Sequence, residues 1–271
     1  MKTRDRAQFP AGEFRRRGLF RMSEALAAGL VVIGMSLGAN TALCAEIVVL
    51  STISTKEALI ELVPEFERAS GHKVNITYAG GSVLSKQILA GTQGDLFIGP
   101  EEFSDPLIEA GKLLAGSRSA FARSSTGLAV RVGAPRPDIS TPEKLKSALL
   151  AATAVSYSAG ASGMHFVKVL DRLGIAEAIA AKRVAPRPGE LVGAVVARGD
   201  AEIAVQQISE LLPVPGIQIL DPLPAELQQM IIYGATVFPQ SAQREAAQAF
   251  VNFLRSEAAR ATLRTKGLEP T

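Results

Sequence analysis

The chain has 271 residues, 47% of them hydrophobic, with a formal net charge of +3 at pH 7 and one cysteine. The basic excess belongs to the N-terminus, because residues 1–45 hold seven of the 29 Lys and Arg but only three of the 26 Asp and Glu. The rest carries 22 basic and 23 acidic side chains, a net charge of −1. This balance argues against nucleic acid or an anionic membrane surface as a partner. The length suits one large domain or two small lobes.

The N-terminal segment has the pattern of an export signal. Arg15-Arg16-Arg17 precedes an apolar run from Ala25 to Leu43, and Ala45 supplies a small residue for cleavage. This pattern is typical of a signal peptide, so residues 1–45 are predicted to be removed on the way to the periplasm. A membrane anchor is the alternative, since about 19 residues almost span a bilayer. Arg16-Arg17 also fits twin-arginine export loosely, so the Sec and twin-arginine routes both stay open.

The only cysteine, Cys44, falls at the end of this leader. Lipidation of Cys44 is an alternative, although Leu43 stands where a lipoprotein motif has a small residue. After cleavage the chain has no thiol, which excludes disulfides, thiolate metal sites and cysteine nucleophiles. The mature protein must therefore be held together by its hydrophobic core.

The residues after the leader alternate between strand and helix patterns. In chain order, the expected strands are residues 47–50, 73–78, 94–98, 127–132, 153–157, 181–185, 202–206, 218–220 and 230–235. The expected helices are residues 56–69, 83–90, 104–110, a helix beginning at 141–143, 164–173, 191–198, 243–255 and 257–265. The β-α-β alternation predicts an α/β protein whose sheets are mixed, mainly parallel and flanked by helices.

The same order predicts two lobes. Two α/β units follow one another, and the last two helices return to the first unit, so the chain is expected to cross near residues 125–127 and 232–237. Lobe one is expected to comprise residues 46–125 and 237–271, and lobe two residues 126–236.

Four strand-to-helix turns are rich in Ser, Thr and Gly. They are residues 51–55, 80–82, 158–163 and 188–190, the last with Gln206-Gln207 nearby. Ligands of open α/β sheets bind beyond the carboxyl ends of the strands, where helix N-termini present free N–H groups and about half a positive charge. Several such ends together form an anion site without Lys or Arg. For any single turn, helix capping explains the same residues, and Ser82 is an expected N-cap.

Few other residues suit catalysis. His165 lies in the first turn of its helix, beside Ser162-Gly163, and is an anion contact, a general base or a packed histidine. The two histidines are 93 positions apart and no cysteine follows the leader, so no metal site is predicted. The sequence has no P-loop, G-x-S-x-G or G-x-G-x-x-G motif, and no cofactor is expected.

Five segments, in their order and spacing, give the chain a resemblance to periplasmic solute-binding proteins of ABC importers, in the molybdate-binding-like branch. They are Val49-Leu-Ser-Thr-Ile-Ser-Thr-Lys-Glu-Ala58, Phe66-Glu-Arg-Ala-Ser-Gly-His-Lys-Val74, Gly80-Gly-Ser-Val-Leu-Ser-Lys-Gln87, Gly94-Asp-Leu-Phe-Ile98 and Glu202-Ile-Ala-Val205. The resemblance covers residues 46–270 and implies the type II periplasmic-binding-protein fold, with a ligand cleft between two hinged lobes.

The resemblance also implies which residues hold the ligand. Ser54 matches a serine contact, and Gly81 stands where a second serine is expected. Ser162 and Leu191 match backbone donors, and Gln207, or alternatively Gln206, replaces a tyrosine that closes the site. With the remaining turn residues, the expected ligand-binding set is Ser54, Thr55, Gly81, Ser82, Ser162, Gly163, His165, Leu191 and Gln207.

Two classes of function follow. The first is a non-enzymatic periplasmic monomer that captures a small anion, an oxyanion or a polycarboxylate, and presents it to an ABC permease. The second is an enzyme, because the resemblance extends to bacterial aconitate isomerases, which implies a proton shift on a tricarboxylate with His165 as the candidate base. The changes at Gly81 and Gln207 weaken molybdate or tungstate as the ligand. The glutamine, His165 and the extra hydroxyls suit a larger anion with several carboxylates. A scaffold or signalling module has no support in the sequence.

Overall fold

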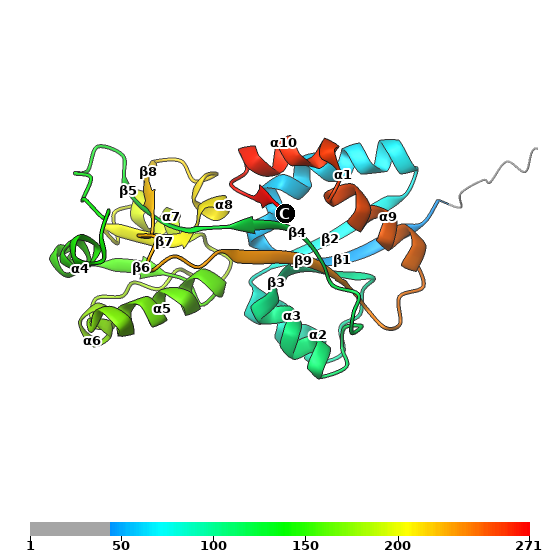
Figure 1. Cartoon of the computed structure of the whole chain (residues 1–271), viewed down its shortest axis with the longest axis horizontal. Helices are drawn as coiled ribbons and strands as arrows, with labels where there is room; N and C mark the ends of the chain where they lie inside the picture. The colour runs from blue at the N-terminus through cyan, green and yellow to red at the C-terminus, as the bar shows by residue number, and fades with distance from the viewer. Residues whose placement is uncertain (1–43) are drawn as a thin grey trace, which may run out of the picture. The chain divides into compact units, whose positions relative to one another are not determined.

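A computed structural model describes residues 44–271, so the predicted leader up to residue 43 lies outside the described part of the chain. The described residues form two mixed β-sheets with helices against both faces of each (Figure 1). The predicted α/β class, with two sheets flanked by helices, is confirmed. Each sheet has a buried core of its own.

The first sheet has the strand order β10-β4-β9-β3-β1-β2. Its strands are β1 (Glu46–Thr52), β2 (Lys73–Ala79), β3 (Leu96–Pro100), β4 (Ser119–Ser124), β9 (Ile231–Val237) and β10 (Glu269–Pro270). A 3₁₀ turn, η1 (Ile53–Thr55), leads from β1 into the first helix. One face is covered by α1 (Lys56–Ser70), α9 (Arg244–Leu254) and α10 (Glu257–Thr265), the other by α2 (Gly81–Leu89) and α3 (Glu101–Glu109) (Figure 1).

The second sheet has the strand order β6-β7-β5-β8. Its strands are β5 (Thr126–Arg131), β6 (Val155–Tyr157), β7 (Ile203–Gln207) and β8 (Ile217–Pro222). One face is covered by α4 (Pro142–Ala151), α5 (Ala161–Leu173) and α6 (Ala176–Ala180), the other by α7 (Val192–Ala197) and α8 (Ile208–Leu211) (Figure 1).

The chain passes twice between the two sheets. The first crossing is at Ser125, between β4 and β5. The second lies between β8 and β9, earlier than the expected residues 232–237, because β9 pairs with β3 and β4 in the first sheet. Gln228 ties the two crossings together, since its side chain accepts from the Thr126 N–H at 3.1 Å and donates to the Thr126 carbonyl at 2.8 Å.

These pairings lead us to propose that lobe one comprises residues 46–125 and 231–271, and lobe two residues 126–230. Buried side chains support the division, because Leu227 belongs to the core around the second sheet and Ile231 to the core around the first. The names lobe one and lobe two are used below in this sense.

The expectation of mainly parallel sheets was wrong. Among the described strands, three pairings are parallel (β1–β2, β1–β3 and β6–β7). Five are antiparallel (β10–β4, β3–β9, β4–β9, β5–β7 and β5–β8). The β-α-β units do pair in parallel. However, β4, which precedes the first crossing, and β9, which follows the second, are antiparallel to the strands beside them.

Three local expectations also differ from the structure. The helix α2 begins at Gly81 with Gly80 as its N-cap and no side-chain cap, so Ser82 is inside the first turn. Residues 181–185 contribute a single bridge between Arg183 and Val155, because the preceding residues form α6. The elements η1, β4, α6, α8 and β10 were not predicted.

A buried carboxylate holds three segments of lobe one together. Asp95, which is 7% exposed, accepts from the Val48 N–H at 2.8 Å and from the Ser241 hydroxyl at 2.7 Å. Hydrogen bonds to a charged group contribute about 1.5–3 kcal/mol each. Asp95 therefore fixes β1 and the start of β3 against the chain that follows β9.

We expect Asp95→Ala to lower the free energy of unfolding by roughly 2–4 kcal/mol, because it leaves a buried N–H and a buried hydroxyl without their acceptor. Urea unfolding followed by circular dichroism measures this. The control is Asp105→Ala, which removes a surface carboxylate paired with Arg118 and should cost no more than about 1 kcal/mol. Equal effects of the two substitutions would contradict the structural role of Asp95.

Candidate ligand-binding cleft

One hollow of about 240 Å³ is lined by both lobes. Lobe one contributes the chain after β1, the turn before α2 and the start of α3; lobe two contributes the turns before α5, α7 and α8. The structure therefore brings all four Ser- and Gly-rich turns to one place. Of the expected ligand-binding residues, Ser54, Gly81, Ser82, Leu191 and Gln207 line it.

Hydroxyl groups form the lobe-one wall beside η1. The Ser54 and Thr52 side chains both line the cleft, and their hydroxyl oxygens lie 3.1 Å apart. Thr55 differs from the expectation: it is fully buried, and its hydroxyl bonds to Ser51 at 2.8 Å and donates to the Thr52 carbonyl at 3.1 Å. Thr55 therefore shapes the turn and does not face the cleft.

The start of α2 presents backbone to the cleft. A Cβ on Gly81 would lie 2.3 Å from the ring of Phe103, so glycine at this position is dictated by packing. The first N–H groups of a helix have no acceptor within it. The Gly81 and Ser82 amides are such groups, and the exposed Ser82 hydroxyl adds a further donor.

The start of α5 is held in place by a network behind the cleft wall. Ser158 to Ala161 line the hollow, whereas Ser162 and Gly163 are buried behind them. The Ser162 hydroxyl donates to the Gln207 side-chain oxygen at 2.7 Å. Ser162 therefore positions Gln207, and this bond leaves the amide N–H groups of Gln207 for other partners.

Gln206 and Leu191 shape the fourth turn. The Gln206 side-chain oxygen accepts from the Val192 N–H at 2.9 Å, in the first turn of α7. Leu191, the N-cap of α7, lines the cleft. Gln206 and Gln207 both line the hollow, and Gln206 also holds the first turn of α7 in place.

His165 is displaced from the cleft. Its Nε2 lies 2.8 Å from the Leu227 carbonyl, and its Nδ1 is buried without a partner among the described residues. The ring sits under the second crossing and does not line the hollow. The structure therefore gives His165 a packing contact in lobe two.

Three charged residues line the cleft: Arg187, Glu190 and Glu210. Glu190 is paired with Arg198 and accepts from the Arg187 N–H at 2.9 Å, and these bonds lower its pKa. Glu210 is half-buried, and loss of solvent around its carboxyl raises its pKa to about 8, so it is mainly neutral at pH 7. Arg198 also pairs with Asp200, so the guanidiniums of Arg187 and Arg198 together balance the carboxylates of Glu190 and Asp200, and it is the amide and hydroxyl donors around the cleft that favour an anion.

A buried phenol is the residue that the sequence did not indicate. Tyr233, on β9, is fully buried, and its hydroxyl has no hydrogen-bond partner among residues 44–271. Burial and the nearby Glu210 raise its pKa, while the side chains of Ser54 and Gln207 oppose the rise. Buried hydroxyls in proteins normally have a hydrogen-bond partner, so the Tyr233 hydroxyl, beside the cleft residues Ser54 and Gln207, is an exception.

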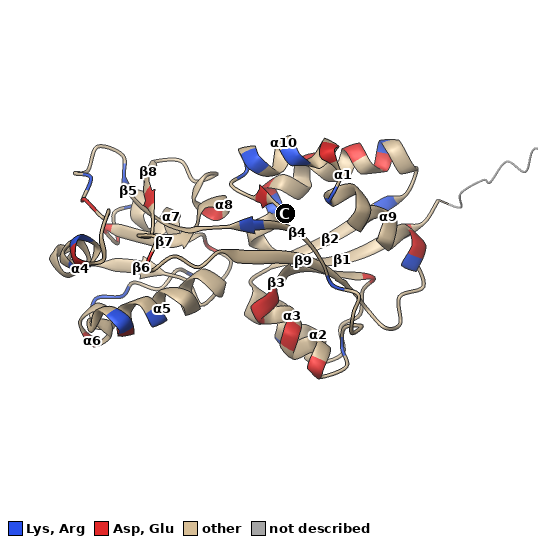
Figure 2. Cartoon of the chain, viewed as in Figure 1, with Lys and Arg blue, Asp and Glu red and all other residues tan. Residues whose placement is uncertain are grey.

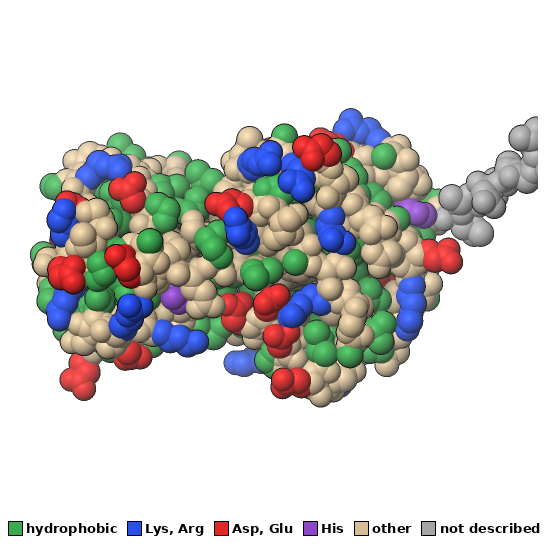
Figure 3. Space-filling view, viewed as in Figure 1, with side chains coloured by type: hydrophobic (Ala, Val, Ile, Leu, Met, Phe, Trp, Pro, Cys, Tyr) green, Lys and Arg blue, Asp and Glu red, His purple; other side chains and the backbone are tan. Residues whose placement is uncertain are grey.

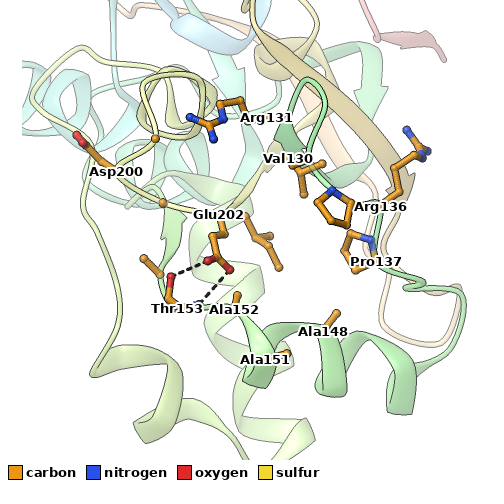
Figure 4. Close-up of a pocket in the computed structure, with 16 residues that line it drawn as sticks. Val130, Arg131, Arg136, Pro137, Ala148, Ala151, Ala152, Thr153, Asp200 and Glu202 are labelled. Carbon is orange, nitrogen blue, oxygen red and sulfur yellow. Dashed lines mark hydrogen bonds between the residues drawn. The ribbon is translucent and has the colours of Figure 1, made fainter.

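A larger hollow, of about 600 Å³, lies within lobe two at the opposite end of β6 and β7 (Figure 4). Ala and Pro make up half of its lining residues, and two of its polar side chains are already bonded to other groups of the protein. Glu202 accepts from the Thr153 N–H at 3.1 Å and hydroxyl at 2.8 Å, and Arg136 donates to the Ile219 carbonyl at 3.2 Å. Because these polar groups are already bonded to the protein, we take the smaller cleft, which both lobes line, as the candidate site.

The outer surface carries mixed charges. Lys, Arg, Asp and Glu share the helices that cover the two sheets (Figure 2), and both signs are interspersed on the face in Figure 3. No helix within residues 44–271 is long and apolar enough to cross a membrane. The same residues contain no cluster of three His, Cys, Asp or Glu side chains that fits a metal ion.

Residues 47–269 match the family described as bacterial extracellular solute-binding protein. The chain is 33% identical over 251 residues to an aconitate isomerase from Pseudomonas sp, covering 89% of this chain and 95% of that protein. It is 25% identical over 250 residues to the molybdate-binding protein ModA of Azotobacter vinelandii, covering 91% and 98%. The solved periplasmic molybdate-binding protein of Azotobacter vinelandii superposes with a TM-score of 0.69 at 19% identity, covering 82% of this chain and 98% of that one.

The chain therefore belongs to the bacterial extracellular solute-binding protein family. Its fold is the type II periplasmic-binding-protein fold, with the cleft described above lined by both lobes. The resemblance inferred from the sequence is confirmed.

Gly163 offers a test of how α5 is anchored. A Cβ at this position would lie 1.8 Å from the Ser158 carbonyl oxygen, so Gly163→Ala must move the backbone at the cleft wall. We expect a loss of about 1–3 kcal/mol in unfolding free energy, measured by urea denaturation. Gly80→Ala is the control, because nothing lies within 4 Å of its Cβ position. A Gly163→Ala protein as stable as the control would show that the α5 start is not packed as described.

Proposed function

We propose that this protein captures a small organic anion with several carboxylates in the cleft, in the periplasm, and presents it as a monomer to an ABC permease. The observation that carries the proposal is the donor set: hydroxyls and first-turn N–H groups from both lobes surround a hollow whose lining includes Arg187. The predicted leader and the periplasmic relative support the compartment.

The size and the side chains of the cleft favour an organic anion over a simple oxyanion. A volume of about 240 Å³ has room for about eight waters at about 30 Å³ each, more than one tetrahedral oxyanion displaces. Gly81 offers no hydroxyl, and Gln207 offers amide N–H groups in place of a phenol. The donors come from several turns on both lobes, which matches a ligand whose carboxylates are separated along a carbon chain.

Saturating ligand should raise the melting temperature, because it binds only the folded state. At one hundred times its Kd a ligand adds ~2.7 kcal/mol, and each kcal/mol is worth about 2–4 °C for a protein of this size. The measurement is a thermal-shift series with trans-aconitate, citrate, molybdate, tungstate and sulfate, in which we expect the tricarboxylates to give the largest shift.

Ser54→Ala should reduce that shift by weakening binding several-fold, since it removes a hydroxyl donor from the cleft wall. The matched control is Ser147→Ala on α4, whose hydroxyl bonds to the Glu143 carbonyl away from the cleft. No shift with any of the five anions, or equal shifts for both variants and the wild type, would contradict capture in this cleft.

An aconitate-isomerase-like enzyme is the second candidate, favoured by the 33% identical relative and by the carboxyl group in the cleft. In this reaction, a base removes a proton from the CH₂ carbon of trans-aconitate. The double bond shifts, and a proton is returned to the carbon that was formerly vinylic, which gives the cis isomer. Glu210 is better placed for this step than His165, because its carboxyl faces the cleft and its pKa of about 8 suits proton transfer near neutrality.

The two candidates differ in one assay. If the protein is an isomerase, trans-aconitate incubated with it accumulates the cis isomer, followed by chromatography. Glu210→Gln should then lower kcat at least 100-fold, whereas His165→Ala should keep most of the activity. A wild-type protein that binds trans-aconitate without converting it removes the enzyme candidate, and activity that survives Glu210→Gln removes Glu210 from the role.

A further inference from the structure

The carboxyl of Glu210 occupies a junction between the lobes. Glu210 lies on α8, directly after β7, and α8 packs against the η1 turn of lobe one. It lines both the cleft and an adjoining hollow of about 480 Å³. The two hollows share lining residues from both lobes, namely Ile53, Gly80, Val83, Pro188, Gly189, Leu191 and Glu210. An anion in the cleft therefore lies beside this carboxyl.

No cation compensates this carboxyl. Glu210 is half-buried and, among the described residues, has no ion-pair partner; loss of solvent raises the pKa of its carboxyl, and the nearby Gln206 side chain opposes the rise. Tyr233 faces it from β9. The other titratable groups around the two hollows are Lys56, Glu57 and Tyr78 from lobe one, and Arg187 and Glu190 from lobe two. Loss of solvent without a compensating cation favours the neutral form of a carboxyl.

A neutral carboxyl differs from a carboxylate in what it offers a ligand. It has one O–H donor, whereas the ionised form only accepts. An anion beside the ionised form would meet a like charge in a partly dehydrated cleft, which disfavours the complex. The same anion beside the protonated form gains a donor.

We propose that Glu210 holds the anion in its protonated form, donating its O–H to the ligand, so that capture retains one proton on the protein. The inference rests on the proposed capture of an anion in this cleft and adds a specificity-determining residue to it.

The sign of the pH dependence follows. In the free protein Glu210 loses its proton as the pH rises through about 8, and a bound anion raises its pKa further. Above pH about 8, binding must therefore take up one proton, and the affinity falls by up to tenfold for each pH unit. Below pH about 7 the carboxyl is already protonated and the affinity is flat.

Tyr78, Tyr233 and Glu190 do not explain a fall in affinity above pH about 8. Burial raises the pKa of Tyr78 to about 12 and that of Tyr233 further, while Arg198 and the Arg187 N–H lower the pKa of Glu190. Arg187 keeps its charge throughout, because a guanidinium is not deprotonated in proteins. Lys56 and Glu57 face the adjoining hollow, and Glu57 supplies the matched control.

The test is isothermal titration calorimetry with trans-aconitate and, separately, molybdate, at pH values from about 6.5 to about 9.5. Both probes are fully ionised above pH about 7, so the ligand contributes no proton of its own in the upper range. Repeating each titration in buffers of different ionisation enthalpy counts the protons taken up. For the wild type we expect an uptake approaching one proton at pH about 9 and an affinity about fivefold weaker than at pH about 8, where half of the free protein is already ionised at Glu210.

Glu210→Gln keeps an N–H donor but cannot titrate, so its affinity should be flat across the range with no proton uptake. Glu57→Gln should retain the wild-type slope. A pH-independent wild type, a slope that persists in Glu210→Gln, or a slope lost in Glu57→Gln overturns the role of Glu210 and leaves anion capture standing. Failure of both probes to bind the wild type at every pH overturns capture of these anions and the inference with it.

Discussion

Amide donors that face one another across a gap are the constraint on which this structure depends. The first turns of α2 and α5 point at one hollow from different lobes, and each carries N–H groups that its own helix cannot satisfy. The charged side chains around them do not oppose an anion, because Arg187 and Arg198 balance Glu190 and Asp200, and loss of solvent raises the pKa of Glu210 to about 8, which keeps it mainly protonated at pH 7. A negatively charged ligand is therefore the species that completes the cleft.

Most of the polar side chains behind the cleft wall are hydrogen-bonded to one another or to the backbone. Ser162 holds Gln207, Gln206 holds the first turn of α7, and Thr55 holds the η1 turn. These groups are buried, so each is worth more as a partner of its neighbour than as a contact of the ligand. Tyr233 breaks the pattern, because its hydroxyl is buried near Ser54 and Gln207 and has no hydrogen-bond partner among residues 44–271.

The sequence predicted what local pattern controls. Helical spacing of apolar residues located α1 to within one residue and α10 at its observed bounds, and the short buried runs located β1, β2 and β7. The Ser- and Gly-rich turns pointed to the place of the cleft because they follow the carboxyl ends of strands.

The remaining features depend on contacts between distant residues. The strand β4 is recognisable as a strand through its pairing with β9, more than 100 positions later. Ser162 and Thr55 have the same chemistry as Ser54, and only their neighbours turn their hydroxyls away from the cleft. Glu210 and Tyr233 looked like ordinary residues, because their surroundings come from distant segments: α8, which carries Glu210, packs against η1, and Tyr233 lies on β9 between β3 and β4.

The most direct test of the central claim is an amide NMR titration with trans-aconitate. The account predicts that the N–H signals of Gly81 and Ser82 on α2 and of Ala161 on α5 shift together, with one saturation curve, because one anion accepts from both lobes. Shifts confined to one lobe, or centred on the separate hollow around Thr153 and Glu202, would contradict it.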